Sequence, residues 1–172
     1  MSRRLYLMRH AKSSWDDAAP DDRGRDLSAR GRAAADRMGA FCGAERIAPA
    51  LVLCSTARRA RETLARLVPH LPGSRRIEFE DGLYLAGAAE LVRRLRRVED
   101  PVRSVMLVGH NPGLQELAAT LCASGDEAAL ARLRGKYPTG ALAEITLPIE
   151  HWRQLEIDTG MLVRFVAPRD LA

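Results

Sequence analysis

The sequence is poor in the residues on which several common kinds of site depend. It has three cysteines, each within an apolar stretch and none in a Cys-x-x-Cys spacing, which argues against a disulfide framework and a zinc knuckle. No window approaches 18 uncharged apolar residues, and residues 1–9 carry arginines but no long apolar run. We therefore expect no membrane span, no export signal and a cytoplasmic location.

Aromatic residues are also scarce. They make up 5% of the chain, which leaves few side chains on which nucleic acid bases stack. The 27 basic and 22 acidic residues give a net charge of +5, which suits either an anionic substrate or a nucleic acid. The densest basic stretch, residues 93–97, lies beside an apolar helical stripe at Leu91, Leu95 and Val98. We interpret it as a solvated helix face and expect no nucleic acid partner.

Sequence motifs that hold metals or nucleotides are missing as well. The chain has no Walker A pattern and no His-Glu-x-x-His motif. We therefore expect no metal and no cofactor.

Short apolar runs alternate with helical patterns along the chain. The clearest buried strands are residues 5–8, 51–54 and 105–108, and residues 77–79 suit a short edge strand. The predicted helices are 28–43 with Ser28 as N-cap, 57–68 with Ser55 and Thr56 as cap, 88–98, and one that Asn111 caps, Pro112 opens and Ala123 ends. Further strands are expected at about 141–147, 154–158 and 161–166, antiparallel because only short turns join them.

This alternation predicts the α/β class. We expect a three-layer α/β/α architecture whose sheet is mostly parallel with an antiparallel edge. A length of 172 residues with 47% hydrophobic content fits one domain over residues 1–172.

Polar residues follow three of the predicted strands. They are Arg9 and His10 after the first, Ser55 with Arg58, Arg59 and Arg61 after the second, and His110 and Asn111 after the third. Ligands of open α/β sheets bind beyond the carboxyl ends of the strands, so these residues form the candidate site. Two helices also begin there, and helix N-termini attract anions. Residues 12–27 lack periodicity and are predicted to form a functional loop beside this site.

Histidines and arginines together suit a phosphoryl group better than other anions. An imidazole attacks phosphorus directly and forms a phosphohistidine intermediate. Arginine keeps its charge, and its planar fork matches phosphate oxygens. Because phosphoryl transfer depends mainly on positioning and charge neutralisation, these groups suffice without a metal.

These residues resemble the motifs of the histidine phosphatase superfamily, which has the phosphoglycerate mutase-like fold. The resemblance lies in Arg9-His10-Ala11, Ser55-x-x-x-Arg59-Ala60-x-x-Thr63 and Gly109-His110, each after a predicted strand. The superfamily usually has Gly where Ala11 stands here. The resemblance narrows to the short SixA-like phosphohistidine phosphatases through Lys12-Ser13-Ser14-Trp15, Arg25-x-Leu27-Ser28-x-x-Gly31, Leu83-Tyr84, Asn111-Pro112-Gly113 and Pro138-Thr139-Gly140-Ala141, and it spans nearly the whole chain.

The resemblance implies roles for four residues. His10 is the expected nucleophile, and Arg9, Arg59 and His110 surround the transferred phosphoryl group. Arg59 is chosen over its neighbouring arginines because it precedes Ala60 in the motif.

A general acid is harder to assign. Glu80 and Asp81 are the nearest acids to the segment that supplies one in larger relatives, and neither aligns cleanly. A phosphohistidine substrate has a good leaving group, so the alternative is that no acid is needed. The roles of Lys12 and Trp15 are left open, either at the substrate or within the loop, and His70 and His151 are interpreted as structural.

The sequence thus predicts a metal-independent phosphatase that forms a phosphohistidine intermediate. The expected substrate is phosphohistidine in a protein, such as a histidine phosphotransfer protein. Two alternatives remain: a phosphatase or mutase for small phosphomonoesters, and a non-enzymatic module that binds phosphate or nucleic acid. The oligomeric state is not predicted.

Overall fold

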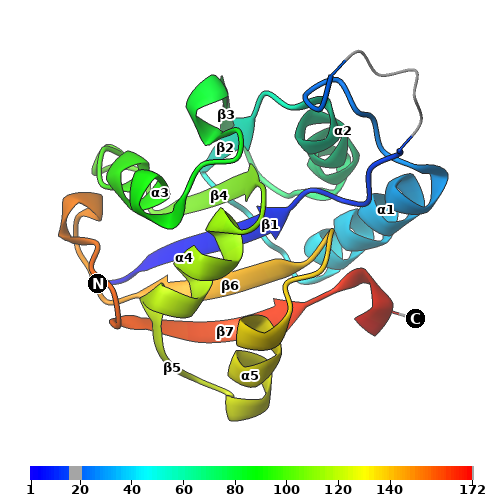
Figure 1. The fold of residues 1–172 in the computed structure, drawn as a ribbon. Helices are drawn as coiled ribbons and strands as arrows, with labels where there is room; N and C mark the ends of the chain where they lie inside the picture. The colour runs from blue at the N-terminus through cyan, green and yellow to red at the C-terminus, as the bar shows by residue number, and fades with distance from the viewer. Residues whose placement is uncertain (16–20, 172) are drawn as a thin grey trace.

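The computed structural model describes residues 1–15 and 21–171. Helices and strands alternate over most of this part of the chain (Figure 1). The strands are β1 (Arg3–Arg9), β2 (Leu51–Ser55), β3 (Arg76–Glu80), β4 (Ser104–Gly109), β5 (Cys122–Gly125), β6 (Leu142–Leu147) and β7 (Gly160–Val166). The α-helices are α1 (Ala29–Ala44), α2 (Arg58–Leu67), α3 (Ala88–Leu95), α4 (Gly113–Leu121) and α5 (Glu127–Gly135), and the 3₁₀ helices are η1 (Val68–His70), η2 (Asp81–Leu83), η3 (Trp152–Gln154) and η4 (Pro168–Asp170).

The strands form one seven-stranded sheet in the order β3-β2-β4-β1-β6-β7-β5. The four strands from β3 to β1 are parallel, whereas β6 pairs antiparallel with both β1 and β7. The predicted mostly parallel sheet with an antiparallel edge is therefore confirmed. One detail differs, because β5 pairs parallel with β7 at the outermost position.

Helices cover both faces of the sheet, which makes three layers (Figure 1). Successive side chains of a strand point to opposite faces, and β1 shows the division. Leu5 and Leu7 pack into the cluster formed with α3, α4 and α5, whereas Tyr6 and Met8 pack into the cluster formed with α1 and α2. Apolar residues on both faces explain why the strand sequences read as continuous apolar runs.

Several local predictions are confirmed. Ser28 is the N-cap of α1, where its hydroxyl accepts a hydrogen bond from the Gly31 N–H. The short edge strand around residues 77–79 is β3.

Two predicted caps are wrong. The N-cap of α2 is Ala57 rather than Ser55 or Thr56, and that of α4 is Pro112 rather than Asn111. Ser55 instead ends β2 and contacts His110, Thr56 donates to Asp81, and Asn111 precedes the cap.

Other predictions fail at the element ends. The strand expected at 154–158 does not form; η3 and a turn take its place, since Trp152 is fully buried and holds the chain in a tight turn. The helix expected over 88–98 ends at Leu95, and the one expected to reach Ala123 ends at Leu121, where β5 begins. β5 and α5 were not predicted.

Gly113 opens α4 directly against the backbone that precedes α3. A Cβ at this position would lie 1.9 Å from the carbonyl oxygen of Ala86, so any side chain pushes α4 away. We expect Gly113→Ala to lower the free energy of unfolding by roughly 1–3 kcal/mol, the usual effect of overpacking. Gly135→Ala is the matched control, because nothing lies within 4 Å of a Cβ there. Urea denaturation of both variants checks this, and equal stabilities would contradict the close approach.

Candidate active site

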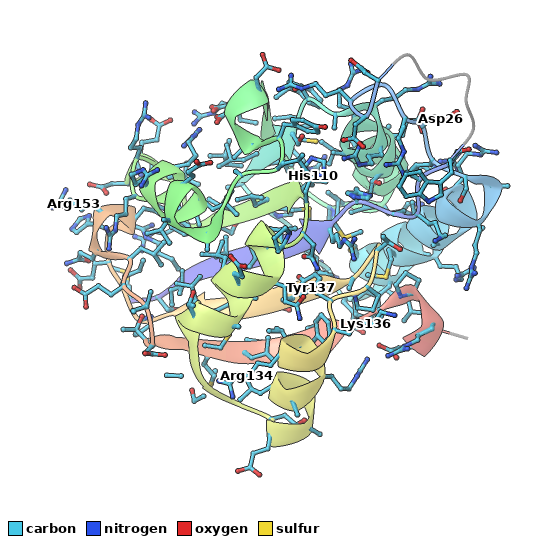
Figure 2. All side chains as sticks on the ribbon, viewed as in Figure 1. Asp26, His110, Arg134, Lys136, Tyr137 and Arg153 are labelled. Atoms are coloured by element: carbon cyan, nitrogen blue, oxygen red, sulfur yellow. The ribbon has the colours of Figure 1, made fainter. Side chains whose placement is uncertain are left out.

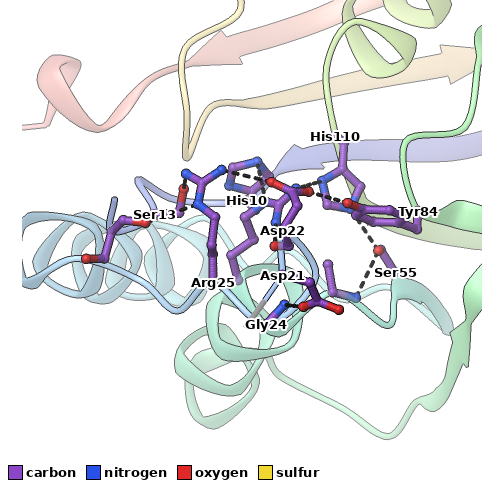
Figure 3. Close-up of polar contacts among 12 residues, drawn as sticks. His10, Ser13, Asp21, Asp22, Gly24, Arg25, Ser55, Tyr84 and His110 are labelled. Atoms are coloured by element: carbon purple, nitrogen blue, oxygen red, sulfur yellow. Dashed lines mark hydrogen bonds and ion pairs between the residues drawn. The ribbon is translucent and has the colours of Figure 1, made fainter. Parts of the chain in front are cut away.

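Three neighbouring strands end at the same edge of the sheet and bring the predicted site residues together. Arg9 pairs with Gly109 in the β1–β4 register, and β2 lies on the other side of β4. His10 and His110 follow directly, and their ring centroids are 5.2 Å apart. Figure 3 shows the two rings beside Ser55, which ends β2. The ends of β1, β2 and β4 thus lie together, as the sequence predicted.

Arg59 lies on the first turn of α2 and reaches between the two histidines. Its side chain is only 4% exposed. Nε is 3.4 Å from Nε2 of His10, and Nη2 is 3.5 Å from Nδ1 of His110. One guanidinium therefore contacts both imidazoles, as the resemblance to the second motif implied for Arg59 rather than Arg58 or Arg61.

His10 is held in one tautomer by its own backbone. Nδ1 lies 2.7 Å from the carbonyl oxygen of Ala11, and a carbonyl only accepts, so Nδ1 carries the proton. Nε2 then carries the lone pair, which accepts a long hydrogen bond of 3.4 Å from Nε of Arg59. Burial, together with the positive charges of Arg59 and Arg9, lowers the pKa of His10 to about 3. At neutral pH the lone pair is not lost to protonation.

His110 is fixed from the opposite side. Its Nε2 donates to the Ser55 hydroxyl at 2.8 Å, and the same hydroxyl accepts from the Ala57 N–H. Burial and the charge of Arg59 lower the pKa of His110 to about 4. Tyr84 packs edge-on against the ring at 5.4 Å. His110 is thus a neutral imidazole whose Nδ1 faces the site.

Thr63 joins α2 to the residue after His10. Its hydroxyl donates to the carbonyl of Arg59 at 2.7 Å and accepts from the Ala11 N–H at 3.0 Å. Ala11 is fully buried. The Thr63 hydroxyl therefore fixes the distance between Arg59 and the residue that follows His10.

Arg9 closes the site on the side of β6. Its Nη1 donates to the Tyr137 carbonyl at 2.8 Å, while its buried Nε has no partner within the part of the chain that the structure describes. Burial lowers the pKa of Arg9, yet an arginine remains charged at neutral pH. Its unsatisfied N–H is available to a bound anion.

A cavity of about 270 Å³ lies over these groups. Its lining residues are Arg9, His10, Lys12, Ser13, Trp15, Arg25, Arg59, Leu85, His110, Asn111 and Thr139. No Asp or Glu of the described residues lines this cavity. Four cationic side chains and two imidazoles make this cavity attractive to an anion.

Comparison with known proteins agrees with this geometry. Residues 5–84 match the model of the histidine phosphatase superfamily, branch 1. An uncharacterized protein of Mycobacterium tuberculosis is 37% identical over 164 residues, which cover 94% of this chain and all of the relative. An uncharacterized protein of Mycobacterium leprae is 34% identical over 166 residues with the same coverage.

The chain belongs to branch 1 of the histidine phosphatase superfamily.

Solved structures of this superfamily resemble the present chain over almost its full length. A candidate phosphohistidine phosphatase SixA from Agrobacterium tumefaciens has 32% identity and a TM-score of 0.79, covering 96% of this chain and 98% of that one. The corresponding candidate SixA from Nakamurella multipartitia has 28% identity and a TM-score of 0.84, covering 98% and 97%. A histidine phosphatase SixA complexed with tungstate, at 23% identity and a TM-score of 0.75, shares the fold.

Glu80 and Asp81, the two acids that the sequence offered as a general acid, lie outside the cavity. Glu80 pairs with Arg94, and Asp81 accepts from Thr56 and Arg23 on the surface. Neither touches a histidine of the site, because β3 is the edge strand and carries both away from β1. Neither lines the cavity as a general acid.

Asp22 is the carboxylate that the sequence reasoning missed. It accepts from Tyr84 and Arg25, and Arg59 donates both to its carboxylate at 3.0 Å and to its carbonyl at 2.7 Å (Figure 3). The hydrogen bond from Tyr84, followed by those from the arginines, lowers the pKa of Asp22 to about 2. It is ionised at neutral pH. The signal in the sequence was its place inside the predicted functional loop, three residues before Arg25.

Four residues of open or structural role can now be placed. Lys12 lines the cavity, and Trp15 lies at its rim, 79% exposed and stacked under Arg25 at 3.7 Å. His70 is exposed at the end of η1, and His151 pairs with Asp100, so neither belongs to the site. Residues 16–20 of the predicted loop lie outside the described part of the chain.

Within residues 1–15 and 21–171, no three His, Cys, Asp or Glu side chains gather as a metal ion requires. No helix in this part of the chain is long and apolar enough to cross a membrane.

The lowered histidine pKa values make stability depend on pH in a defined direction. In the unfolded chain each histidine takes up a proton below about pH 6.5, whereas His10 and His110 stay neutral in the fold down to about 3 and 4. Stability is therefore full above pH 6.5 and falls as the pH drops. Between pH 7 and 5, His10 and His110 each lower the free energy of unfolding by roughly 2 kcal/mol.

Between pH 7 and 5, we expect the free energy of unfolding of His10→Gln to fall by about 2 kcal/mol less than that of the parent, because glutamine does not titrate. Urea denaturation at both pH values measures the difference. His70→Gln is the control, since that ring is exposed. A pH dependence that is identical in all three proteins would show that His10 is not held neutral by the fold.

Proposed function

We propose that this protein is a metal-independent phosphatase in which Nε2 of His10 accepts the phosphoryl group. The observation that carries the proposal is the unprotonated Nε2 of His10 beside the buried charge of Arg59, in a cavity lined by cations. A nucleophile must be unprotonated, and its lowered pKa meets that need at neutral pH.

The surrounding groups match the charge of a transferred phosphoryl group. Arg59 and Arg9 offer N–H donors to its equatorial oxygens, which carry the charge in the transition state. A bound dianion also raises the pKa of His110, so that its Nδ1 gains a proton and becomes a further donor. Ser55 keeps that ring oriented by accepting from its other nitrogen.

The reaction then takes two steps. Nε2 of His10 forms a bond to phosphorus as the bond from phosphorus to the leaving group breaks. Water next attacks phosphorus, Nε2 departs with its electron pair, and orthophosphate is released. Nδ1 keeps its proton throughout because the Ala11 carbonyl holds it.

The leaving group decides which substrates suit this site. An alkoxide needs a proton as it departs, but no carboxylic acid lines the described cavity and Asp22 is held ionised. A phosphohistidine protonated on its distal nitrogen releases a neutral imidazole without such help. We therefore propose phosphohistidine in a protein as the substrate of the proposed phosphatase.

Trapping the phosphoenzyme tests the nucleophile. We expect radiolabelled phosphate to be bound in an acid-labile, alkali-stable linkage, as a phosphoramidate requires, and His10→Ala to abolish both labelling and turnover by at least about 10³-fold. His70→Ala, which removes an exposed histidine, is expected to label normally. Undiminished labelling of His10→Ala would refute the assignment.

Substrate comparison tests the leaving group. A phosphohistidine peptide should turn over at least roughly 10²-fold faster than a sugar phosphate, the usual contribution of a missing general acid. EDTA should leave the rate unchanged.

The variant Asp22→Asn tests the alternative that Asp22 acts as the general acid. We expect it to retain its activity on both substrates. Loss of sugar phosphate hydrolysis alone in this variant would identify Asp22 as a proton donor and overturn the assignment of an acid-free site.

A further inference from the structure

A second, larger cavity adjoins the phosphoryl site. It has a volume of about 450 Å³ and shares Arg9, Lys12 and Thr139 with the first cavity. Its other lining residues are Arg30, Ala34, Arg37, Lys136, Pro138, Ala167, Pro168 and Arg169. They come from α1, from the segment between α5 and β6, and from η4, and Figure 2 shows Lys136 beside η4.

The lining of this cavity is strongly cationic. Six of its residues are Arg or Lys, both lysines of the chain are among them, and no lining residue in the described part of the chain is acidic. Arg30 and Arg37 are seven residues apart on α1, which places them on one helix face, with the small Ala34 between them. The helix thus presents two guanidinium groups with open space between them.

The described part of the chain contains no carboxylate paired with most of these cations. In residues 1–15 and 21–171, no acidic side chain forms an ion pair with Lys12, Arg30, Arg37, Lys136 or Arg169. Acids do lie next to two of them in the sequence but turn elsewhere, since Asp36 pairs with Arg66 and Asp170 with Arg132. Unpaired cations that converge on a cavity create a site for a multiply charged anion.

Arg9 connects the two cavities. It lines both, and its buried Nε is without a partner in the described residues. The two cavities therefore adjoin at Arg9, and a substrate that extends from the first cavity can enter the second. The size of the cavity, about 450 Å³, is that of a small-molecule site rather than of a flat protein interface.

We propose that this cavity is a subsite for the inner phosphate of a substrate with two or more phosphates, so that the enzyme also removes the terminal phosphoryl group of organic diphosphates. The proposal rests on the proposed function of His10. It adds a second substrate class to that function.

The chemistry requires no additional reactant. Nε2 of His10 forms a bond to the terminal phosphorus, and the anhydride P–O bond breaks. The bridging oxygen leaves as part of the inner phosphate, which is stable as an anion and needs no general acid. Water then cleaves the N–P bond; one of its protons stays on orthophosphate and the other is released to solvent.

The double variant Arg30→Ala/Arg37→Ala tests the subsite, with Arg93→Ala/Arg97→Ala as a control that removes the same charge near α3. The substrates are a nucleoside diphosphate and p-nitrophenyl phosphate, which has no second phosphate. We expect the first variant to raise the KM for the diphosphate by roughly 10–100-fold with kcat nearly unchanged, and to affect p-nitrophenyl phosphate far less. The control should behave as the parent does.

Calorimetric titration gives a second readout that does not depend on turnover. Because His10 would cleave pyrophosphate, the titrations use His10→Ala. Inorganic pyrophosphate should bind His10→Ala at least about 10-fold more tightly than orthophosphate, and the preference should disappear when Arg30→Ala/Arg37→Ala is added. Equal binding of the two anions by His10→Ala would overturn the subsite.

The outcomes distinguish this proposal from the one on which it rests. A parent enzyme that forms the His10 phosphoenzyme but does not hydrolyse the diphosphate would overturn the subsite alone. Absence of any phosphoenzyme would overturn the proposed function. If the double variant impaired only a phosphohistidine protein, the cavity would be a protein docking surface and the diphosphate proposal would be wrong.

Discussion

The site depends on the burial of one charge, that of Arg59. A guanidinium that is 4% exposed has lost almost all of its hydration, and this is tolerable only when its N–H groups find acceptors. Here the acceptors are His10, His110 and Asp22. Burial is the main reason that both imidazoles stay neutral, and the charge of Arg59 adds to it by opposing a second positive charge nearby. Packing around Arg59 thus favours both the neutral histidines and the binding of an anion.

The fold supplies this arrangement through short polar contacts at the strand ends. Ser55 and Thr63 are completely buried, and each hydroxyl both orients a site residue and satisfies a backbone group. Ser55 orients the ring of His110, and Thr63 links Arg59 to Ala11. Because β1, β2 and β4 are neighbours in the sheet, these contacts bridge segments that are far apart in the sequence.

The sequence predicted the elements whose signals are local. Continuous apolar runs predicted β1, β2 and β4, and polar residues at their ends predicted His10 and His110 as site residues. The family resemblance selected Arg59 among the neighbouring arginines. The failures arose where tertiary contacts decide. Asn111 suited an N-cap by residue type, but the cap is Pro112, and the Asn111 side chain lies between the Gln115 N–H and the Tyr137 carbonyl. β5 has one buried residue of four and no periodic pattern, so only its pairing with β7 reveals it. Asp22 was missed because a contact with Arg59, 37 residues away, leaves no pattern in the sequence.

The pair formed by Arg59 and Asp22 is asymmetric in a way that bears on substrate entry. Asp22 is 45% exposed, whereas Arg59 is almost fully buried, so the carboxylate regains hydration when it moves away and the guanidinium does not. An incoming phosphoryl dianion offers Arg59 more acceptor oxygens and more charge than the carboxylate does. In the proposed reaction the phosphoryl oxygens would therefore compete with Asp22 for the N–H groups of Arg59. Tyr84 and Arg25 are further donors to the Asp22 carboxylate.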